Sequence, residues 1–142
     1  MDPMSISLSA LNVEWQRLQI SAQNLANMNS TRSGDGRTYH PLRLVSGPDL
    51  AFADLLATPG ATAPPVGVRV VNVEDQPNGL RVSYEPNHPH ADSDGFVTYP
   101  NVDHAAEMTL MIRASRVYEA NLAAVSIAQE MYNRALDLGR QS

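Results

Sequence analysis

The one stretch of the chain whose residue types could bind a metal ion reads HPHADSDG, at residues 88–95. It offers two imidazoles and two carboxylates within seven residues, and nitrogen and oxygen donors of this kind hold divalent ions. The proline between the histidines gives a poor chelating geometry, however, and no second cluster completes a site. An Asp-x-Asp-Gly segment also matches part of a calcium loop, but the distal glutamate and the other oxygen ligands are missing. We therefore interpret the segment as an Asx-type turn leading into a strand and predict no metal or cofactor; the candidate ligands would have been His88, His90, Asp92 and Asp94.

No arrangement of residues typical of catalysis stands out. No serine lies in a Gly-x-Ser-x-Gly elbow, and no glycine-rich phosphate loop follows a predicted strand. Nothing singles out a carboxylate pair for acid–base work. The chain has no cysteine, which excludes disulfides, thiol nucleophiles and cysteine-ligated metals. We therefore expect that the protein is not an enzyme.

Composition indicates a folded protein without a nucleic-acid or membrane partner. Of the 142 residues, 43% are hydrophobic and 18% are charged, which is not the composition of a charge-rich disordered chain. The formal net charge of -5 argues against nucleic acid or an anionic membrane as the main partner. We expect no transmembrane helix, because no apolar run is long enough, and no cleavable secretory signal, because no basic segment precedes an apolar core. All ten basic residues are arginine, for which coding bias and buried ion pairs between subunits are both open explanations.

The most regular part of the chain is its C-terminal third, Asp103–Leu138, which contains neither proline nor glycine. Apolar side chains recur there at steps of four and three in two neighbouring rows, a pattern typical of one wide apolar face on a long helix. Such a helix would be about 50 Å long, and a partner must cover its face. The first row is Leu110, Ala114, Val117, Ala124, Ala128, Met131, Ala135 and Leu138, and the second is Met108, Met111, Tyr118, Leu122, Val125, Tyr132 and Leu136.

A second amphipathic helix is predicted at the N-terminus. It would begin at Asp2-Pro3-Met4, with aspartate as the cap and proline in the first helical position. It is expected to end near Asn27–Ser30, where polar turn residues cluster. Its apolar residues form a heptad seam of Met4, Leu8, Leu11, Trp15, Leu18, Ala22 and Leu25.

Between the helices, residues 31–102 are predicted to form a small β-rich unit with two or three hairpins. The turn Gln76–Gly79 is interpreted as a hairpin joining the strands on either side of it. Leu50–Leu56 is a short strand or helical turn, and a flexible loop rich in proline and alanine follows near 57–65. Strands are predicted at Arg37–Val45, where Pro41 indicates an edge or a bulge, and at Gly67–Glu74, Leu80–Tyr84 and Phe96–Tyr99.

The sequence thus predicts an α+β fold. Long N- and C-terminal α-helices pack as an antiparallel coiled coil, with a small β-rich middle domain inserted between them. The terminal helical domain comprises residues 4–30 and 103–142, and the middle domain comprises residues 31–102. Because the C-terminal helix carries two apolar rows, one is expected to pack on the N-terminal helix and the other on neighbouring subunits.

The candidate functional site is therefore an assembly interface along the two helices. Three asparagines lie on or beside the apolar seams, where they are either solvated or hydrogen-bonded between helices to fix their register. Both interpretations stay open. The expected interface residues are Leu11, Trp15, Leu18, Asn24, Leu25, Asn27, Leu110, Val117, Tyr118, Asn121, Leu122, Val125 and Met131.

Several segments resemble the flagellar rod and hook family. Ala22–Asn27 reads AQNLAN, which is similar to the Ala-x-Asn-Leu-Ala-Asn that ends the family's N-terminal helix. Ala114–Asn121, ASRVYEAN, is similar to the family's closing helix. In the middle, YEPNHPHAD, GFV and PNVD within Tyr84–Asp103 resemble the proximal rod subunits of that family. Phe96 and Asp103 depart mildly from the pattern, which has Tyr and Asn there.

This resemblance implies a structural subunit of the proximal rod, the drive shaft of the bacterial flagellum that transmits motor torque for motility. It implies helical assembly with further copies and with other rod proteins of the FlgB, FlgF, FlgG and FliE types. It also implies location in the basal body within the periplasmic space, after passage through the flagellar type III export apparatus without a cleaved signal peptide. The alternative is a soluble helical adaptor or chaperone-like binding module with a β insert, which would use the same apolar face.

Overall fold

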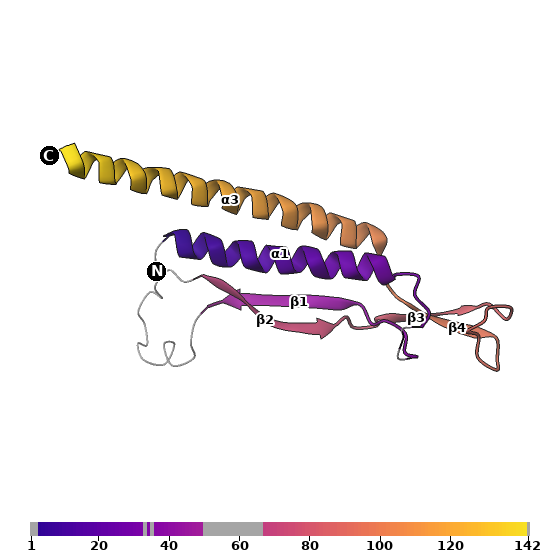
Figure 1. Cartoon of the computed structure of the whole chain (residues 1–142). Helices are drawn as coiled ribbons and strands as arrows, with labels where there is room; N and C mark the ends of the chain where they lie inside the picture. Colours follow the sequence, from indigo (N-terminus) through magenta and orange to yellow (C-terminus); the bar gives the residue numbers. More distant parts are fainter. Residues whose placement is uncertain (1–2, 33, 35, 50–66, 142) are drawn as a thin grey trace, which may run out of the picture.

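The computed structural model describes residues 3–32, 34, 36–49 and 67–141. The molecule is elongated, with α1 lying between α3 on one side and the β1–β2 ribbon on the other (Figure 1). The two helices run antiparallel, so the start of α1 and the end of α3 lie at the same end of the molecule. The α+β architecture predicted from the sequence is confirmed. The elements are α1 (Pro3–Asn27), β1 (Leu42–Pro48), β2 (Val68–Asp75), β3 (Leu80–Tyr84), β4 (Phe96–Pro100) and α3 (His104–Gln141).

Both helices end where their capping residues allow. Asp103 caps α3, because its Oδ1 accepts a hydrogen bond of 3.1 Å from the backbone N–H of Ala106. At the other end α3 runs past Leu138, the last residue of the periodic pattern, as far as Gln141. The helix α1 ends at Asn27, whose carbonyl accepts a 2.9 Å bond from the N–H of Ser30, as the cluster of polar residues predicts. None of the helices within the described residues is both long and apolar enough to cross a membrane.

The strands form two separate two-stranded antiparallel sheets. The ribbon β1–β2 pairs Leu42 with Asp75 at one end and Pro48 with Val68 at the other, with a bulge between Val45 and Ser46. The β3–β4 hairpin pairs Leu80 with Pro100. The sheets therefore share no strand, although all four strands lie within residues 31–102.

The prediction that Gln76–Gly79 closes a hairpin between β2 and β3 is wrong. The turn exists, with Asn78 in the left-handed region at φ 57°, but β2 pairs with β1 and β3 pairs with β4. Two contacts explain the difference. The N–H of Gln76 bonds to the carbonyl of Pro41 at 2.8 Å, which keeps β2 on β1, and the N–H of Asn101 bonds to the carbonyl of Gly79 at 2.8 Å, which extends the β3–β4 ladder.

Two further expectations for the middle of the chain are corrected or lie outside the described residues. The predicted strand at Arg37–Val45 begins later, at Leu42, because Pro41 has no N–H for the ladder. Two antiparallel pairs of consecutive strands, β1–β2 and β3–β4, are seen in the described part of the chain, in agreement with the two or three hairpins expected. The expectations for Asp2, for Leu50–Leu56 and for the loop near 57–65 concern residues that the structure does not describe. The division into a terminal helical domain and a middle domain stays a prediction.

The helix α1 packs on two sides, which the single heptad seam did not predict. Leu11 lies beside Tyr118 of α3, whereas Val13, one turn before Arg17, is only 3% exposed. Arg17 on the same side donates a 3.1 Å hydrogen bond to Ser46 Oγ in β1. Consequently Leu8, Trp15 and Ala22 of the predicted seam are exposed, although the Trp15 ring still contacts Tyr118 of α3.

Gly67 allows the start of β2 to approach α1 closely. A Cβ at this position would lie 2.4 Å from Ser9 Oγ and 3.0 Å from Ser9 Cβ. The same Ser9 hydroxyl accepts a 3.0 Å hydrogen bond from the N–H of Val68 and donates one of 2.7 Å to the carbonyl of Ile6. A side chain at position 67 would therefore push the ribbon off the helix.

We expect Gly67→Ala to lower the free energy of unfolding by about 1–3 kcal/mol, the usual cost of overpacking. Urea denaturation followed by circular dichroism measures this change. Gly139→Ala is the matched control, because nothing lies within 4 Å of that position, and alanine in a helix is about 1 kcal/mol better than glycine. Equal effects of the two substitutions would contradict the close approach.

Candidate assembly interface

The contact between the helices uses one narrow stripe of α3. Ala114 is fully buried, Val125 is 8% exposed, and Tyr118 contacts Trp15 with ring centroids 6.3 Å apart. These positions belong mainly to the second apolar row, together with Ala114 from the first. The N-terminal helix therefore covers only part of the second row, since four of its members are between 40% and 64% exposed: Met108, Leu122, Tyr132 and Leu136. Most of the first row is left uncovered as well.

A buried asparagine joins the two helices to the ribbon. Asn24 is only 1% exposed, and its side-chain oxygen accepts hydrogen bonds from the N–H of Leu42 at 2.9 Å and from the Tyr39 hydroxyl at 2.8 Å. Its amide nitrogen donates to the carbonyl of Leu42 at 2.9 Å and to Glu107 Oε1 at 2.8 Å. Asn24 thus pairs with Leu42 as another strand would, and also ties α1 to α3. We call Asn24, Tyr39, Leu42, Gln76 and Glu107 the polar hub.

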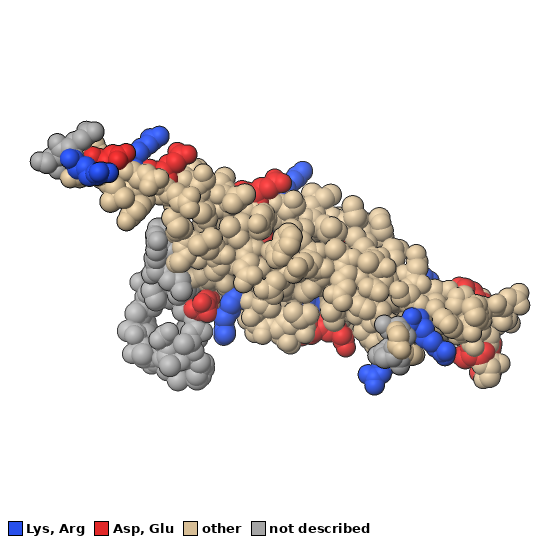
Figure 2. Space-filling model, in the orientation of Figure 1, with Lys and Arg blue, Asp and Glu red and all other residues tan. Residues whose placement is uncertain are grey.

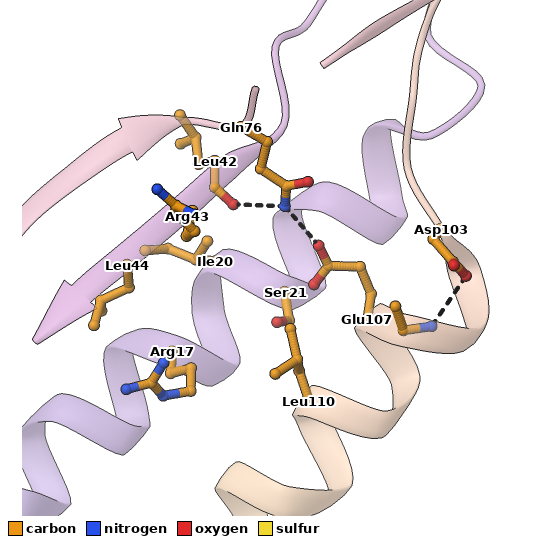
Figure 3. A pocket seen from close by; sticks show the side chains of 11 residues that line it. Arg17, Ile20, Ser21, Leu42, Arg43, Leu44, Gln76, Asp103, Glu107 and Leu110 are labelled. Atoms are coloured by element: carbon orange, nitrogen blue, oxygen red, sulfur yellow. Dashed lines mark hydrogen bonds between the residues drawn. The ribbon is translucent and has the colours of Figure 1, made fainter. Parts of the chain in front are cut away.

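Glu107 closes the polar hub from the first turns of α3. It is 4% exposed, and its Oε1 also accepts a 3.1 Å hydrogen bond from Gln76 Nε2 (Figure 3). The N-terminal end of a helix favours a negative charge, which helps to stabilise a carboxylate there. Its other oxygen, Oε2, has no hydrogen-bond partner within the described residues. A cavity of about 240 Å³ lies beside it, lined also by Arg17, Ser21 and Leu110.

The polar hub raises the pKa of Tyr39 above its ordinary value of 10.0. Burial is the largest cause, and the negative charges of Glu107 and Asp75 add to it. The phenol therefore stays protonated and donates to Asn24 at all ordinary pH values.

This shift predicts a loss of stability in alkali. A raised folded-state pKa means that the contribution of Tyr39 is complete below pH 10 and is lost as the pH rises through the folded-state pKa. We expect the urea midpoint to fall above pH 10 more steeply for the natural chain than for Tyr39→Phe. The pKa of Tyr99 is also raised, by its hydrogen bond to Glu85, but this effect is common to both proteins. Parallel curves for the two proteins would contradict the prediction.

The predicted interface residues fall into three groups by exposure. Those in the first group are buried, those in the second are half-buried, and those in the third are exposed and free to meet another molecule. The first group is Leu11, Asn24 and Val125; the second is Leu18, Leu25, Asn27, Tyr118 and Asn121; the third is Trp15, Leu110, Val117, Leu122 and Met131.

The three asparagines do not behave alike. Asn24 makes the bonds between elements that one interpretation foresaw. Asn27 and Asn121 instead donate back to carbonyls of their own helices, those of Gln23 at 2.9 Å and Val117 at 2.8 Å. Within one chain, only Asn24 of the three fixes the register of the helices.

The last turns of α3 extend beyond the start of α1 (Figure 1). All the side chains described from Gln129 to Arg140 are exposed, including Met131 at 67% and Leu138 at 70%. In Figure 2 charged side chains follow the outer edge of α3 and the hairpin end of the molecule, while the face over α1 is nearly free of them. This distribution is typical of a surface that packs against protein.

The residues at 88–95 form a turn, as predicted. Asp92 Oδ1 accepts hydrogen bonds from the N–H groups of Asp94 at 3.0 Å and Phe96 at 2.8 Å. Gly95 has a φ of 81°, and a Cβ there would lie 3.0 Å from Tyr84 Cε2. His90 Nδ1 lies 2.7 Å from Thr31 Oγ1. No group of three histidine or acidic side chains suited to a metal ion occurs in the part of the chain described.

Several residues of the polar hub were missed by the sequence analysis. Glu107 comes just before the apolar rows and was assigned no role, and Gln76 was interpreted as a turn residue. Tyr39 lies in the segment predicted to be a strand. The available signal was Asn24 within the AQNLAN segment, but a buried amide does not reveal its partners from sequence.

Comparison with known proteins agrees with this arrangement. Residues 93–138, which include most of α3, match the family model described as flagellar basal body rod FlgEFG protein C-terminal. The C-terminal third of the chain is therefore similar to flagellar basal body rod proteins.

The relatives that match over nearly the whole chain are more specific. The chain is 36% identical over 135 residues to a flagellar basal-body rod protein FlgC of Yersinia enterocolitica, covering 95% of this chain and 94% of the relative. It is 32% identical to the FlgC of Borreliella burgdorferi over 93% of both chains, and 30% identical to that of Bacillus subtilis over 96% of both. The chain therefore belongs to the FlgC family of flagellar basal-body rod proteins.

Proposed function

We propose that the protein is a structural subunit of the flagellar basal-body proximal rod and acts by assembly rather than by catalysis. The observation that carries this proposal is the uncovered apolar row of α3. Leu110 and Val117 are each 38% exposed, and the row continues through Met131 and Leu138 beyond the end of α1. A solvated helix of one chain gains nothing from such a row, whereas a packed assembly buries it.

The total surface supports the same conclusion. The chain exposes 9906 Å², whereas a compact monomer of 15.4 kDa would expose roughly 7,200 Å². The excess of about 2,700 Å² reflects the elongated shape of the molecule, which leaves the sides of the helix pair open to neighbours. Burial of this surface against neighbours would make the rod stiff enough to transmit torque.

The partners in this proposal are further copies of the chain and other rod proteins, of the FlgB, FlgF, FlgG and FliE types. The rod lies in the periplasmic space, and the subunit reaches it through the flagellar type III export apparatus without a cleaved signal peptide. The absence of cysteine from the sequence suits assembly in an oxidising compartment.

Deletion of the gene tests the proposal. We expect the deleted strain not to swim, and expression of the natural chain to restore swimming. Antibodies against the protein should detect it in purified hook–basal bodies of the complemented strain. A deleted strain that swims normally, or basal bodies that lack the protein, would refute the proposed function.

A further inference from the structure

The α1–α3 pair has an uncovered apolar surface on each of two sides, and different residues form the two. Flank A combines both helices, and its large side chains are between 40% and 53% exposed. Flank B is a single heptad row of α3. Flank A consists of Leu8, Trp15, Met108, Ile112 and Leu122; flank B consists of Leu110, Val117, Ala124, Met131 and Leu138.

The two flanks face in different directions. At 3.6 residues per turn, Leu122 of flank A and Val117 of flank B lie about 140° apart around α3. The seam with α1 occupies the space between them, at Ala114, Tyr118 and Val125. One neighbouring helix cannot cover both flanks, so each needs its own partner.

The flanks also differ in shape. Flank A contains an open groove of about 480 Å³ between the helices, with Leu18, Met111 and Ser115 in its lining. Methionine side chains adapt to the surface that enters such a groove. Flank B is a row on one helix with residues seven apart, and the small Ala124 at its centre would allow close approach of another helix. Leu110 and Val117, at one end of the row, also line a hollow of about 300 Å³ beside the Glu14–Arg17 ion pair of α1. The apolar row of flank B can therefore pack into the groove of flank A.

Charges at the two edges are complementary. Glu119 stands with Arg116 at the rim of the flank A groove, and Glu130 and Asp137 continue on that side of α3. Arg113 stands at the rim of flank B, beside Leu110 and Val117. Neither Glu119 nor Arg113 takes part in an ion pair among the described residues. Placing flank A on flank B would bring a free carboxylate toward a free guanidinium.

We propose that flank A of one copy receives flank B of a second copy, with Glu119 facing Arg113. Because the two surfaces differ and lie on different sides, the contact is heterologous and repeats from copy to copy into a ring or an open helix. This inference rests on the proposed function, since it specifies how copies lie side by side in the rod.

Engineered cysteines test the pairing directly, because the natural chain has none. Glu119→Cys labels flank A and Arg113→Cys labels flank B, at the two positions that the proposal places opposite one another. Oxidation of an equimolar mixture at millimolar concentration should give mostly the mixed dimer, and each variant alone should give little dimer. Homodimers of either variant alone in similar yield, or no dimer at all, would overturn the proposal.

Two assembly-blocked variants give an independent test by analytical ultracentrifugation. Ile112→Asp blocks flank A and Val117→Asp blocks flank B, and both sites are exposed enough for the chain to stay folded, which circular dichroism checks. Each variant alone should be monomeric, and their mixture should stop at a dimer. A dimer formed by either variant alone, or a mixture that stays monomeric, would overturn the proposal.

Exchanging the charges at positions 119 and 113 tests the proposed ion pair and leaves the apolar contact between the two flanks intact. Glu119→Arg alone and Arg113→Glu alone should each weaken self-association about fivefold, the scale of one surface pair. The double variant should return to within about threefold of the natural chain. Failure of the double variant to recover would refute the Glu119–Arg113 contact. Presence of the natural chain in basal bodies would still support the proposed function in that case, so the two failures are distinguishable.

Discussion

Replacing Asn24 with alanine should lower the free energy of unfolding by about 3 kcal/mol. The substitution removes four hydrogen bonds and leaves the N–H of Leu42 buried without its partner, and a buried unsatisfied polar group costs about 1–3 kcal/mol. Glu107 would lose one of its two donors at the same time. Urea denaturation of the isolated chain, followed by circular dichroism, measures the change.

Asn27→Ala is the matched control. Asn27 lies one turn further along α1, and its amide bonds only to its own helix and to Ser30, so the expected change is within about 0.5 kcal/mol. Similar losses in the free energy of unfolding for Asn24→Ala and Asn27→Ala would contradict the role assigned to the Asn24 hydrogen bonds.

Asn24→Asp adds a negative charge at position 24 and keeps the shape of the side chain, so it tests the effect of charge alone. A carboxylate at position 24 would face Glu107 Oε1, which now accepts a hydrogen bond from the amide. At neutral pH this variant should therefore be less stable than Asn24→Ala, because two buried like charges repel. The difference in the free energy of unfolding between Asn24→Asp and Asn24→Ala should decrease as the pH is lowered toward about 4, where carboxyl groups take up protons.

The second large effect is expected on assembly and not on folding. Leu122 is 53% exposed on α3, so Leu122→Asp should change the stability of the isolated chain by less than about 0.5 kcal/mol. In the rod the same aspartate would be buried in an apolar contact, which costs several kcal/mol. We expect cells that carry this variant to lose swimming in soft agar, and their basal bodies to lack the protein.

Two neighbouring substitutions make this result specific. Leu122→Met keeps an apolar side chain of similar volume and should support swimming. Val125→Asp places the charge in the seam with α1, where Val125 is 8% exposed, and should unfold the isolated chain as well. Normal swimming of cells that carry Leu122→Asp would show that Leu122 does not lie in the assembly interface.

The helices could be predicted from the sequence because their signals are local. The proline at position 3, the cap at Asp103 and the unbroken periodicity of α3 each act within a few residues of one another. The hydrophobic rows also indicated that α3 has a second partner. What the periodicity could not show is that α1 itself is packed on two sides, because the ribbon meets it through a few polar contacts from Ser9, Arg17 and Asn24.

The strand pairing and the polar hub could not be predicted, because both depend on contacts between distant residues. Asn24 and Glu107 are 83 positions apart, and Gln76 reaches Glu107 across 31. The turn at Gln76–Gly79 has the composition of a hairpin, yet the anchoring of Gln76 on Pro41 and on Glu107 decides otherwise. Local turn chemistry specifies a change of direction but not which strands lie side by side.

The polar hub and the seam hold α3 on α1 over part of its length, and the rest of α3 projects from this fixed part. The hub holds α1 and α3 together at the end nearest the β3–β4 hairpin, and the opposite tip of α3 extends past α1 without contact (Figure 1). The seam holds α3 on α1 as far as Val125, and the turns beyond it are about 24 Å long, so each degree of bend there would move the far tip by about 0.4 Å. Small bends of the projecting turns would let identical subunits fit sites of different curvature, while the part of α3 held by the polar hub and the seam keeps its geometry.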